Sequence, residues 1–545
     1  MVTQQNKAQT LKFLRLRPTS ISFIALALLS ILVIVPSCSS DKVDFAVIAP
    51  ADTLIYIESI DLGKALGAVT SSRDFKESVE SSPDFSAVNG MRVGIMVTGM
   101  DAQDDSAPDL DGTEIRIKPR FVLVANSDSW FWDPADFLEG PIADFVAGSY
   151  GKGVKAENID DKDGIITAWK AVDGRRVFAM AKEELVFFSN DIESLRLVLA
   201  THRGERDNLS GNSALQKIRG ESIAASGYIS QRGVAQLSNF VGISTALATT
   251  DDEDGKSFIA RVVPDLLRAN VREVLWTSTI SNGGITDQYE VVLSEQVSEE
   301  MSVAMQTVTR ESDELLSMIP SSAKSVTRYD LASPSIAWDT LIGNLTGSTD
   351  ILNGSVLGRV ADGALASYGI TLANGFASAA TAPVFTASLD ETGEQVLAVF
   401  KVRDPEMLKS VVAIDFIKPP ESVESFSLWK SDDDEFAYAE KGDLVILGEM
   451  ESVMLSLSAM RSGEVLSKMS GIERFIGTKG ATVTLGKDSD SIDQLAKALS
   501  LKTKGKRSGD SVYVVATEFT SRGIVRKTSS SSGLIGALIS QFSGR

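Results

Sequence analysis

Residues 169–189 read WKAVDGRRVFAMAKEELVFFS. Val177 to Ala181 and Leu185 to Phe188 are two apolar segments, rich in the aromatic and aliphatic residues that are typical of strands. Lys182-Glu183-Glu184 separates them and is too short for the helical crossover that parallel strands need. The stretch therefore predicts an antiparallel hairpin.

The same arrangement recurs at residues 429–448, which read WKSDDDEFAYAEKGDLVILG. Other pairs of segments keep the same order along the chain, which indicates an internal duplication. The further pairs are Ile48 to Pro50 with Ile319-Pro320, Thr53 to Glu58 with Ser325 to Tyr329, Asp61-Leu62 with Asp330-Leu331, Gly94 to Val97 with Gly369 to Leu372, Val122 to Val124 with Val396 to Val399, Asp133-Pro134 with Asp404-Pro405, Ile192 to Leu199 with Val453 to Leu457, and Val274 to Ile285 with Val512 to Ile524.

The spacing of these pairs predicts an α+β fold of two tandem similar domains, each built of antiparallel meander sheets with interleaved helices. Both Asp-Pro pairs should start helices, with Asp as the N-cap and Pro at the first helical position. The two tryptophans that open the repeated stretches, Trp169 and Trp429, should occupy equivalent buried positions. The expected organisation is a signal peptide at 1–37, a tether at 38–46, one copy at 47–295, a linking helix at 296–319 and a second copy at 320–545.

The first 38 residues resemble a bacterial lipoprotein signal. Basic residues from Lys12 to Arg17 precede an uncharged apolar run from Ile21 to Val35, which is shorter than the ~20 residues of a membrane-spanning helix. Pro36 and Ser37 separate this run from Cys38, which is the single cysteine of the chain and therefore forms no internal disulfide. We expect cleavage before Cys38 and its acylation; an ordinary cleaved signal and an uncleaved anchor are the alternatives.

The net charge and the composition limit the kinds of partner that the protein can bind. Of the 545 residues, 43% are hydrophobic and 23% charged, as in folded proteins, and the net charge is −20. An acidic surface repels nucleic acid, so we expect no nucleic-acid partner. We expect a protein of the bacterial cell envelope, anchored to the membrane through acyl chains on Cys38. Ser39 after the cysteine resembles the sorting signal for the outer membrane rather than the inner.

The segment Ile48-Ala49-Pro50-Ala51-Asp52-Thr53 and the duplicated layout behind the signal resemble uncharacterised bacterial envelope lipoproteins. The resemblance covers most of the mature chain in layout. It implies no activity and no functional residue beyond the lipidated Cys38.

Catalysis that depends on histidine or cysteine is nearly excluded. His202 is the single histidine and follows an apolar helix, where a cation near the C-terminus is an ordinary stabilising feature. With Cys38 acylated, nucleophilic triads and zinc sites built on His and Cys lack their residues. We therefore expect no catalytic residue, no metal site and no cofactor.

Acidic and aromatic clusters are the remaining candidate binding sites. Asp101 to Gly112, Asp251 to Gly255 and Asp432 to Glu435 are acidic, and we interpret them as solvated turns, with weak calcium binding as the alternative. In the first cluster Ser106 and Gly112 stand where an EF-hand loop needs Gly and Glu. Trp130 to Trp132 directly precedes the Asp133-Pro134 helix start, so we expect it to pack on that helix rather than form a binding platform.

The leading hypothesis is a non-enzymatic envelope lipoprotein that binds a protein or peptide partner. A carboxylate-based glycan hydrolase is one alternative, and it requires acids with raised pKa values in one pocket. A small-ligand-binding module with a cleft between the two copies is the other.

The lipoprotein interpretation makes Cys38→Ala a direct test. The substitution should block processing and leave a precursor held by its uncleaved apolar segment. Metabolic labelling with a fatty-acid analogue should mark the wild-type chain and not the variant. Label that persists in Cys38→Ala would refute lipidation at this residue.

Overall fold

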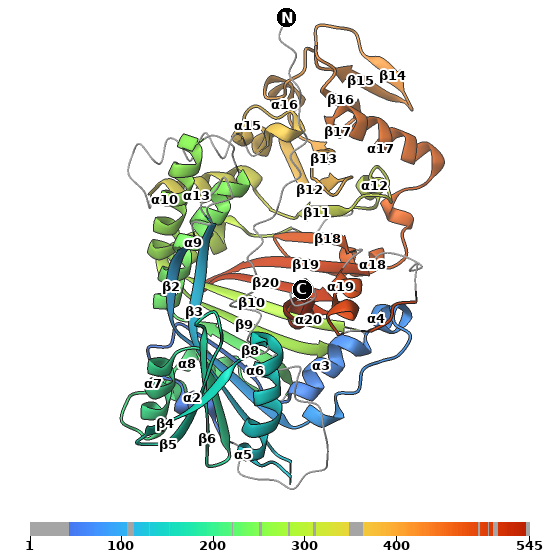
Figure 1. The fold of residues 1–545 in the computed structure, drawn as a ribbon. Coiled ribbons are helices and arrows are strands. Elements are labelled where there is room, and N and C mark those ends of the chain that lie inside the picture. Colours follow the sequence, from blue (N-terminus) through green and yellow to red (C-terminus); the bar gives the residue numbers. More distant parts are fainter. Residues whose placement is uncertain are drawn as a thin grey trace, which may run out of the picture.

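The fold was obtained as a computed structural model. It describes residues 43–540 except 106–113, 130, 152, 221, 250–252, 282–283, 309–311, 348–362, 364, 489–490, 500 and 505–510. Helices and strands are interleaved along the whole described chain, and the strands form one large antiparallel sheet (Figure 1). The predicted mixed antiparallel fold class is confirmed.

The first ten strands lie in the first half of the fold, residues 43–304. They are β1 (Ile55–Ser59), β2 (Met91–Asp105), β3 (Glu114–Ser127), β4 (Lys155–Asp161), β5 (Gly164–Lys170), β6 (Arg176–Lys182), β7 (Leu185–Ser189), β8 (Ile223–Ile229), β9 (Val271–Ser281) and β10 (Gly284–Leu293). The hydrogen-bonded order across the sheet is β4-β5-β6-β7-β3-β2-β1-β8-β9-β10.

The other ten strands follow in the second half. They are β11 (Ser325–Tyr329), β12 (Ala380–Ser388), β13 (Val396–Val402), β14 (Glu421–Val423), β15 (Phe426–Lys430), β16 (Phe436–Lys441), β17 (Leu444–Glu449), β18 (Thr482–Asp488), β19 (Ser511–Thr520) and β20 (Gly523–Ser530). Their order is β14-β15-β16-β17-β13-β12-β11-β18-β19-β20, which is the first order with ten added to each number.

The two series meet at their last strands. Residues 285–292 of β10 pair antiparallel with residues 523–530 of β20, so the sheet runs without interruption from β4 to β14. In Figure 1, β9, β10, β20, β19 and β18 lie side by side across the middle of the molecule.

The helices connect the strands and cover the sheet. Those of the first half are α2 (Phe45–Ile48), α3 (Leu62–Ser71), α4 (Arg73–Ser78), η1 (Ser86–Val88), α5 (Pro134–Phe137), η2 (Leu138–Ile142), α6 (Ala143–Tyr150), α7 (Ile192–His202), η3 (Leu209–Gly211), α8 (Ser213–Lys217), α9 (Gln231–Thr249), α10 (Glu253–Asn270) and α11 (Glu295–Ala304). Those of the second half are α12 (Asp313–Leu316), α13 (Pro334–Gly347), η4 (Ala366–Tyr368), α15 (Ala373–Ala379), α16 (Pro405–Ser410), α17 (Met450–Ser462), η5 (Leu466–Lys468), α18 (Ile472–Gly477), α19 (Ser491–Ala498) and α20 (Gly533–Ser540).

Local signals placed many of these elements correctly. Asp61 caps α3 by accepting a hydrogen bond from the N–H of Lys64. Asp133 and Asp404 cap α5 and α16, each with proline at the first helical position. The two predicted hairpins are β6–β7 and β16–β17, and each closes with a Lys paired to a Leu, Lys182 with Leu185 and Lys441 with Leu444.

Two predictions about segments were wrong. Gly369 to Leu372 is not a strand comparable to Gly94 to Val97, because β12 at Ala380–Ser388 stands in that place of the order. The single linking helix predicted for residues 296–319 is two helices, α11 and α12. The chain leaves the helix after Ala304 because residues 306–308 pair with the segment after β11: Val308 N–H donates to the carbonyl of Asp330 and Ala332 N–H donates to that of Gln306.

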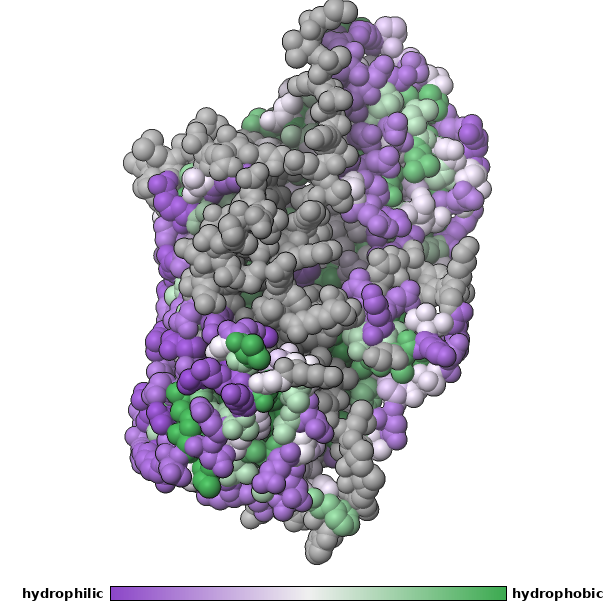
Figure 2. Space-filling view, viewed as in Figure 1, coloured by the Kyte–Doolittle hydropathy of each residue, from purple (hydrophilic) through white to green (hydrophobic). Residues whose placement is uncertain are grey.

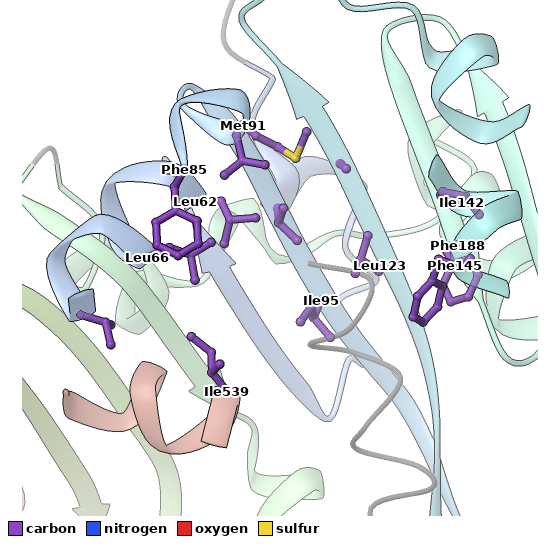
Figure 3. Close-up of a cluster of buried hydrophobic side chains, with 14 of the residues drawn as sticks. Leu62, Leu66, Phe85, Met91, Ile95, Leu123, Ile142, Phe145, Phe188 and Ile539 are labelled. Atoms are coloured by element: carbon purple, nitrogen blue, oxygen red, sulfur yellow. The ribbon is translucent and has the colours of Figure 1, made fainter. Parts of the chain in front are cut away.

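The final helices of the two series pack across the junction. α20 lies against α3 of the first half and against α19, while α11 lies against α13, β19 and β20 of the second half. Ile539 of α20 therefore belongs to the same buried cluster as Leu62 and Leu66 of α3 (Figure 3). Each half completes part of the core of the other.

Trp169 and Trp429 lie on β5 and β15, which occupy the same place in the two orders. Their registers differ by two residues, because Trp169 pairs with Val177, five residues before the hairpin residue Lys182, and Trp429 with Tyr438, three before Lys441. Trp169 is buried, whereas Trp429 is only half-buried and contacts the rings of Phe416 and Tyr438 at its edge. The expectation that both are largely buried was wrong for Trp429.

This difference predicts unequal costs of truncation. Trp169→Ala should lower the free energy of unfolding by about 3–5 kcal/mol, because it leaves a cavity in a closed core. Trp429→Ala should cost less, because solvent already reaches the ring. Urea unfolding of both variants, with the exposed Val172→Ala as the control, measures the difference. Equal losses for the two tryptophans would contradict the packing.

Candidate functional site

A broad groove lies between α11 and α13 and has a volume of about 560 Å³. The two helices pack against each other. Its walls are mainly apolar and include Glu299, Glu300 and Val303 from α11 and Ile336, Gly343 and Asn344 from α13.

Helical periodicity places these α11 residues on the outside. Ser298, Met301 and Ala304 are the buried residues of α11. Glu299, Glu300 and Val303 share another face, because residues three or four apart in a helix lie together. Val303 is 68% exposed although it is aliphatic. The outer face of α11 therefore combines two carboxylates with an apolar side chain.

The helix α13 is rich in apolar residues but poorly buried. Of its 14 residues only Ala337 is buried, whereas α3, in the corresponding place after β1, buries seven of ten. Ile336 is 57% exposed, and Trp338 and Leu341 are half-buried. Although α15 packs on it, α13 is thus less covered than α3.

Gly343 marks the open part of the groove. A Cβ atom built on Gly343 would meet no atom within 4 Å, so the space above this residue is empty in the described structure. Because glycine has no side chain, another segment can approach the α13 backbone closely here. The site can therefore accept a bulky side chain or a second helix.

A buried ionic cluster lies elsewhere, on β1. The side chain of Glu58 is only 1% exposed. It accepts hydrogen bonds from Arg92 Nη2 at 3.1 Å, from Arg219 Nε at 2.9 Å and from the hydroxyl of Tyr56 at 2.9 Å. Every polar atom of this carboxylate is thus used inside the fold, and the cluster has the character of a structural clamp.

The clamp holds the start of the described chain. Arg219 also donates to Asp44 at 2.6 Å, and Arg92 donates to the carbonyl of Val43. Burial acts to raise the pKa of Asp44, but the hydrogen bonds from Arg219 and from the N–H of Ala46 outweigh it and lower the pKa. Residues 43 and 44 are therefore fixed to the sheet a few positions after Cys38.

Carboxylates with raised pKa values are dispersed. Burial raises the pKa of Glu273 on β9, of Asp287 on β10 and of Asp330 after β11. Asp330 pairs with Arg328 at 2.8 Å, and Arg328 also donates to backbone carbonyls of residues 475, 476 and 478. None of these carboxylates lines the groove between α11 and α13. Asp287 and Asp330 are instead held by hydrogen bonds within the fold.

The histidine and the aromatic cluster have structural contacts. His202 ends α7, with its Nε2 atom 3.4 Å from the Glu183 carboxylate and its ring 6.1 Å from that of Phe187. Trp132, the residue before the N-cap Asp133, packs on Phe137 with ring centroids 4.8 Å apart. This contact is the expected hydrophobic staple; Phe131 beside it is 62% exposed, and Trp130 lies outside the described residues.

The described parts of two acidic clusters lie on β-hairpins. Asp101 lies on β2 and is 3.5 Å from Arg120 on β3, while Asp109 and Asp111 lie outside the described residues. Asp251 and Asp252, between α9 and α10, are also outside them. Asp433, in the turn between β15 and β16, accepts from Ser431 Oγ at 2.6 Å and from the N–H of Glu435 at 3.2 Å. Within the described ranges, no three acidic, histidine or cysteine side chains converge as metal ligands would.

Two further observations bear on the membrane. Cys38, the predicted lipidation site, lies outside the described residues. In the described part of the chain, no helix is both long and apolar enough to cross a bilayer. The described surface seen in Figure 2 is largely hydrophilic, with several hydrophobic patches between the charged residues.

The groove was missed by sequence reasoning. Residues 334–347 read PSIAWDTLIGNLTG, with apolar side chains around most of a helix, which predicts burial on all sides. The apolar pattern is visible in the sequence, but the open groove depends on how α11 and α13 pack against each other. Comparison of the chain with known family models, with curated proteins and with solved structures found no match.

Asp287 allows a test of the structural role of the carboxylates whose pKa values are raised. Its two oxygens accept from Trp276 Nε1 at 3.0 Å and from the N–H of Leu534 at 2.7 Å, which ties β9 and β10 to α20. Burial raises the pKa of Asp287 in the folded protein. The contribution of Asp287 to the free energy of unfolding is therefore fully present below a pH of ~3.9, the pKa of an Asp in an unfolded chain. It is lost as the pH rises through the folded-state pKa.

Asp287→Asn should therefore flatten the dependence of stability on pH in that acid window. It should also cost about 1–3 kcal/mol at low pH, because one amide oxygen replaces two acceptor groups. Urea unfolding between pH 3 and 8, with the exposed Asp265→Asn as the control, measures both effects. A pH dependence identical to that of the wild type would contradict the assignment.

Proposed function

We propose that this protein is a lipid-anchored, non-enzymatic protein of the bacterial cell envelope that binds a protein or peptide partner in the groove between α11 and α13. The observation that carries the proposal is the exposed apolar pair Val303 and Ile336 facing that groove. Exposed apolar surface rimmed by polar residues is typical of interaction sites. Anchoring rests on Cys38 and the signal-like segment before it.

We further propose that the chain consists of two tandem similar domains, residues 47–295 and 320–545, that arose by duplication. The identical strand orders support this division. The binding site would then lie where α11, in the segment that links the copies, meets α13, the first long helix of the second copy. Such a junction exists only in the duplicated chain.

The anchored binding protein is favoured over the two alternatives by particular contacts. A glycan hydrolase needs two carboxylates across one bond of the substrate. Glu58 is closed off by Arg92 and Arg219, and Asp287 is committed to Trp276 and Leu534. A small-ligand cleft finds less support, because the groove is broad and leaves Val303 and Ile336 exposed, whereas small-ligand pockets enclose most of their ligand.

The test is selective loss of the partner from cross-linked envelopes. Val303→Glu and Ile336→Glu place a charge in the groove, and an unpaired charge at an apolar contact is costly. Capture of the partner by the full-length chain should fall at least about tenfold, which corresponds to ~1.4 kcal/mol. Both positions are exposed, so the melting temperature should remain close to that of the wild type.

Matched controls are Val172→Glu and Ile417→Glu, two exposed apolar residues outside the groove, at 84% and 92% exposure. They introduce the same charge and should leave capture unchanged. Equal capture by groove and control variants would refute the groove as the binding site. Recovery of no partner with the wild-type chain would refute the binding function.

A further inference from the structure

The helix pair that corresponds to α11 and α13 is covered by the chain itself. α20 and α3 follow β20 and β1, as α11 and α13 follow β10 and β11. α19 packs on α20 and on α4, and α4 packs on α3. Ile492, Leu495 and Ala496 of α19 are buried in the same cluster as Leu66 of α3 and Ile539 of α20. A short amphipathic helix thus completes this pair.

The pair formed by α11 and α13 is covered less completely: α15 packs on α13, and Asn374 donates to Asp339 of α13 at 2.9 Å, but Val303 and Ile336 remain exposed. α9 and α10 occupy the place of α19 in the chain order, between the eighth and ninth strands of their series. They pack mainly on each other and on β8 and β9. Val303 and Ile336 are consequently exposed, and the space above Gly343 is empty.

The geometry favours a helix over an extended peptide as the occupant. A strand binds by adding to the open edge of a sheet, and this groove lies between two helices whose backbone groups are already paired. A helix satisfies its own backbone and needs only side-chain contacts. α19 shows the pattern in this fold, with apolar residues at positions i, i+3 and i+4.

The rim of the groove is negatively charged, which favours a positively charged partner. Glu299 and Glu300 are exposed and adjacent on α11, on the face that carries Val303. Carboxylates at the edge of an interface select basic partners and accelerate their association. An acidic or phosphorylated partner would be repelled at this rim.

We propose that the groove binds an amphipathic helix of a partner protein, with aliphatic side chains at i, i+3 and i+4 spacing against Val303 and Ile336 and with Lys or Arg opposite Glu299 and Glu300. This inference rests on the proposed binding function and specifies the chemistry of the partner. The helix takes the role that α19 has on the other helix pair.

The test is site-specific photo-cross-linking in intact cells. p-Benzoylphenylalanine replaces Val303 in one full-length variant and Thr340 in another, and the cross-linked peptides are sequenced. Both positions should label one segment of one partner, at residues three, four or seven apart, within a segment that carries Lys or Arg. Glu299→Lys combined with Glu300→Lys should reduce labelling from position 303 at least tenfold.

Glu295→Lys is the matched control for the charge reversal, because Glu295 is exposed on α11 one turn before the groove. It should leave labelling unchanged. Gly343→Phe should block labelling by filling the empty space, whereas Gly343→Ala should leave it nearly intact.

Three outcomes would overturn the inference. Cross-links to residues 348–362 of the same chain would mean that the chain fills its own groove, and cross-links to a second copy would make the groove a self-association surface. Cross-links at every second residue of the partner would indicate an extended peptide. In the last case the groove variants Val303→Glu and Ile336→Glu still release the partner, so the proposed function stands while the helical occupant is refuted.

Discussion

The antiparallel pairing of β10 with β20 is the constraint on which the rest of the structure depends. Residues 285–292 and 523–530 would otherwise present unpaired N–H and C=O groups at the edges of two separate sheets, where they invite aggregation. Paired with each other, they turn the two series into one sheet and bring the final helix of each series over the other half. Ile539 reaches the cluster of Leu66 for this reason, and Asp287 can hold the N-terminus of α20.

The two series share a strand order but differ in how that order is stabilised. The fourth residue of β1 is Glu58 and the fourth of β11 is Arg328, and both are buried. Glu58 is neutralised by two arginines, whereas Arg328 uses Asp330 and three backbone carbonyls. A buried charge needs partners, but the sheet tolerates either sign at this position. The helices of the two series also differ in their packing. The pair α3 and α20 is covered by α4 and α19, whereas the pair α11 and α13 retains a groove.

Hairpins and helix starts were predictable because their causes are local. The charged turns after Lys182 and Lys441 are too short for anything except antiparallel strands, and Asp133 and Asp404 cap helices through contacts within three residues. The errors fall where distant segments decide. The helix predicted for residues 296–319 breaks because residues 306–308 pair with residues 330–332, and Gly369 to Leu372 resembles a strand only in its composition.

By itself the sequence determined the strand-rich antiparallel character of the chain, its repeated segments, its acidic charge and the signal-like segment that ends at Cys38. Periodicity, turn length and capping act over a few residues, so they can be recognised without coordinates. Only the tertiary structure decided that all strands join one sheet, that Trp169 is buried while Trp429 is half-exposed, and that Val303 and Ile336 face a common groove. These features depend on which surfaces meet, and the free energy of such contacts comes from residues far apart in the chain.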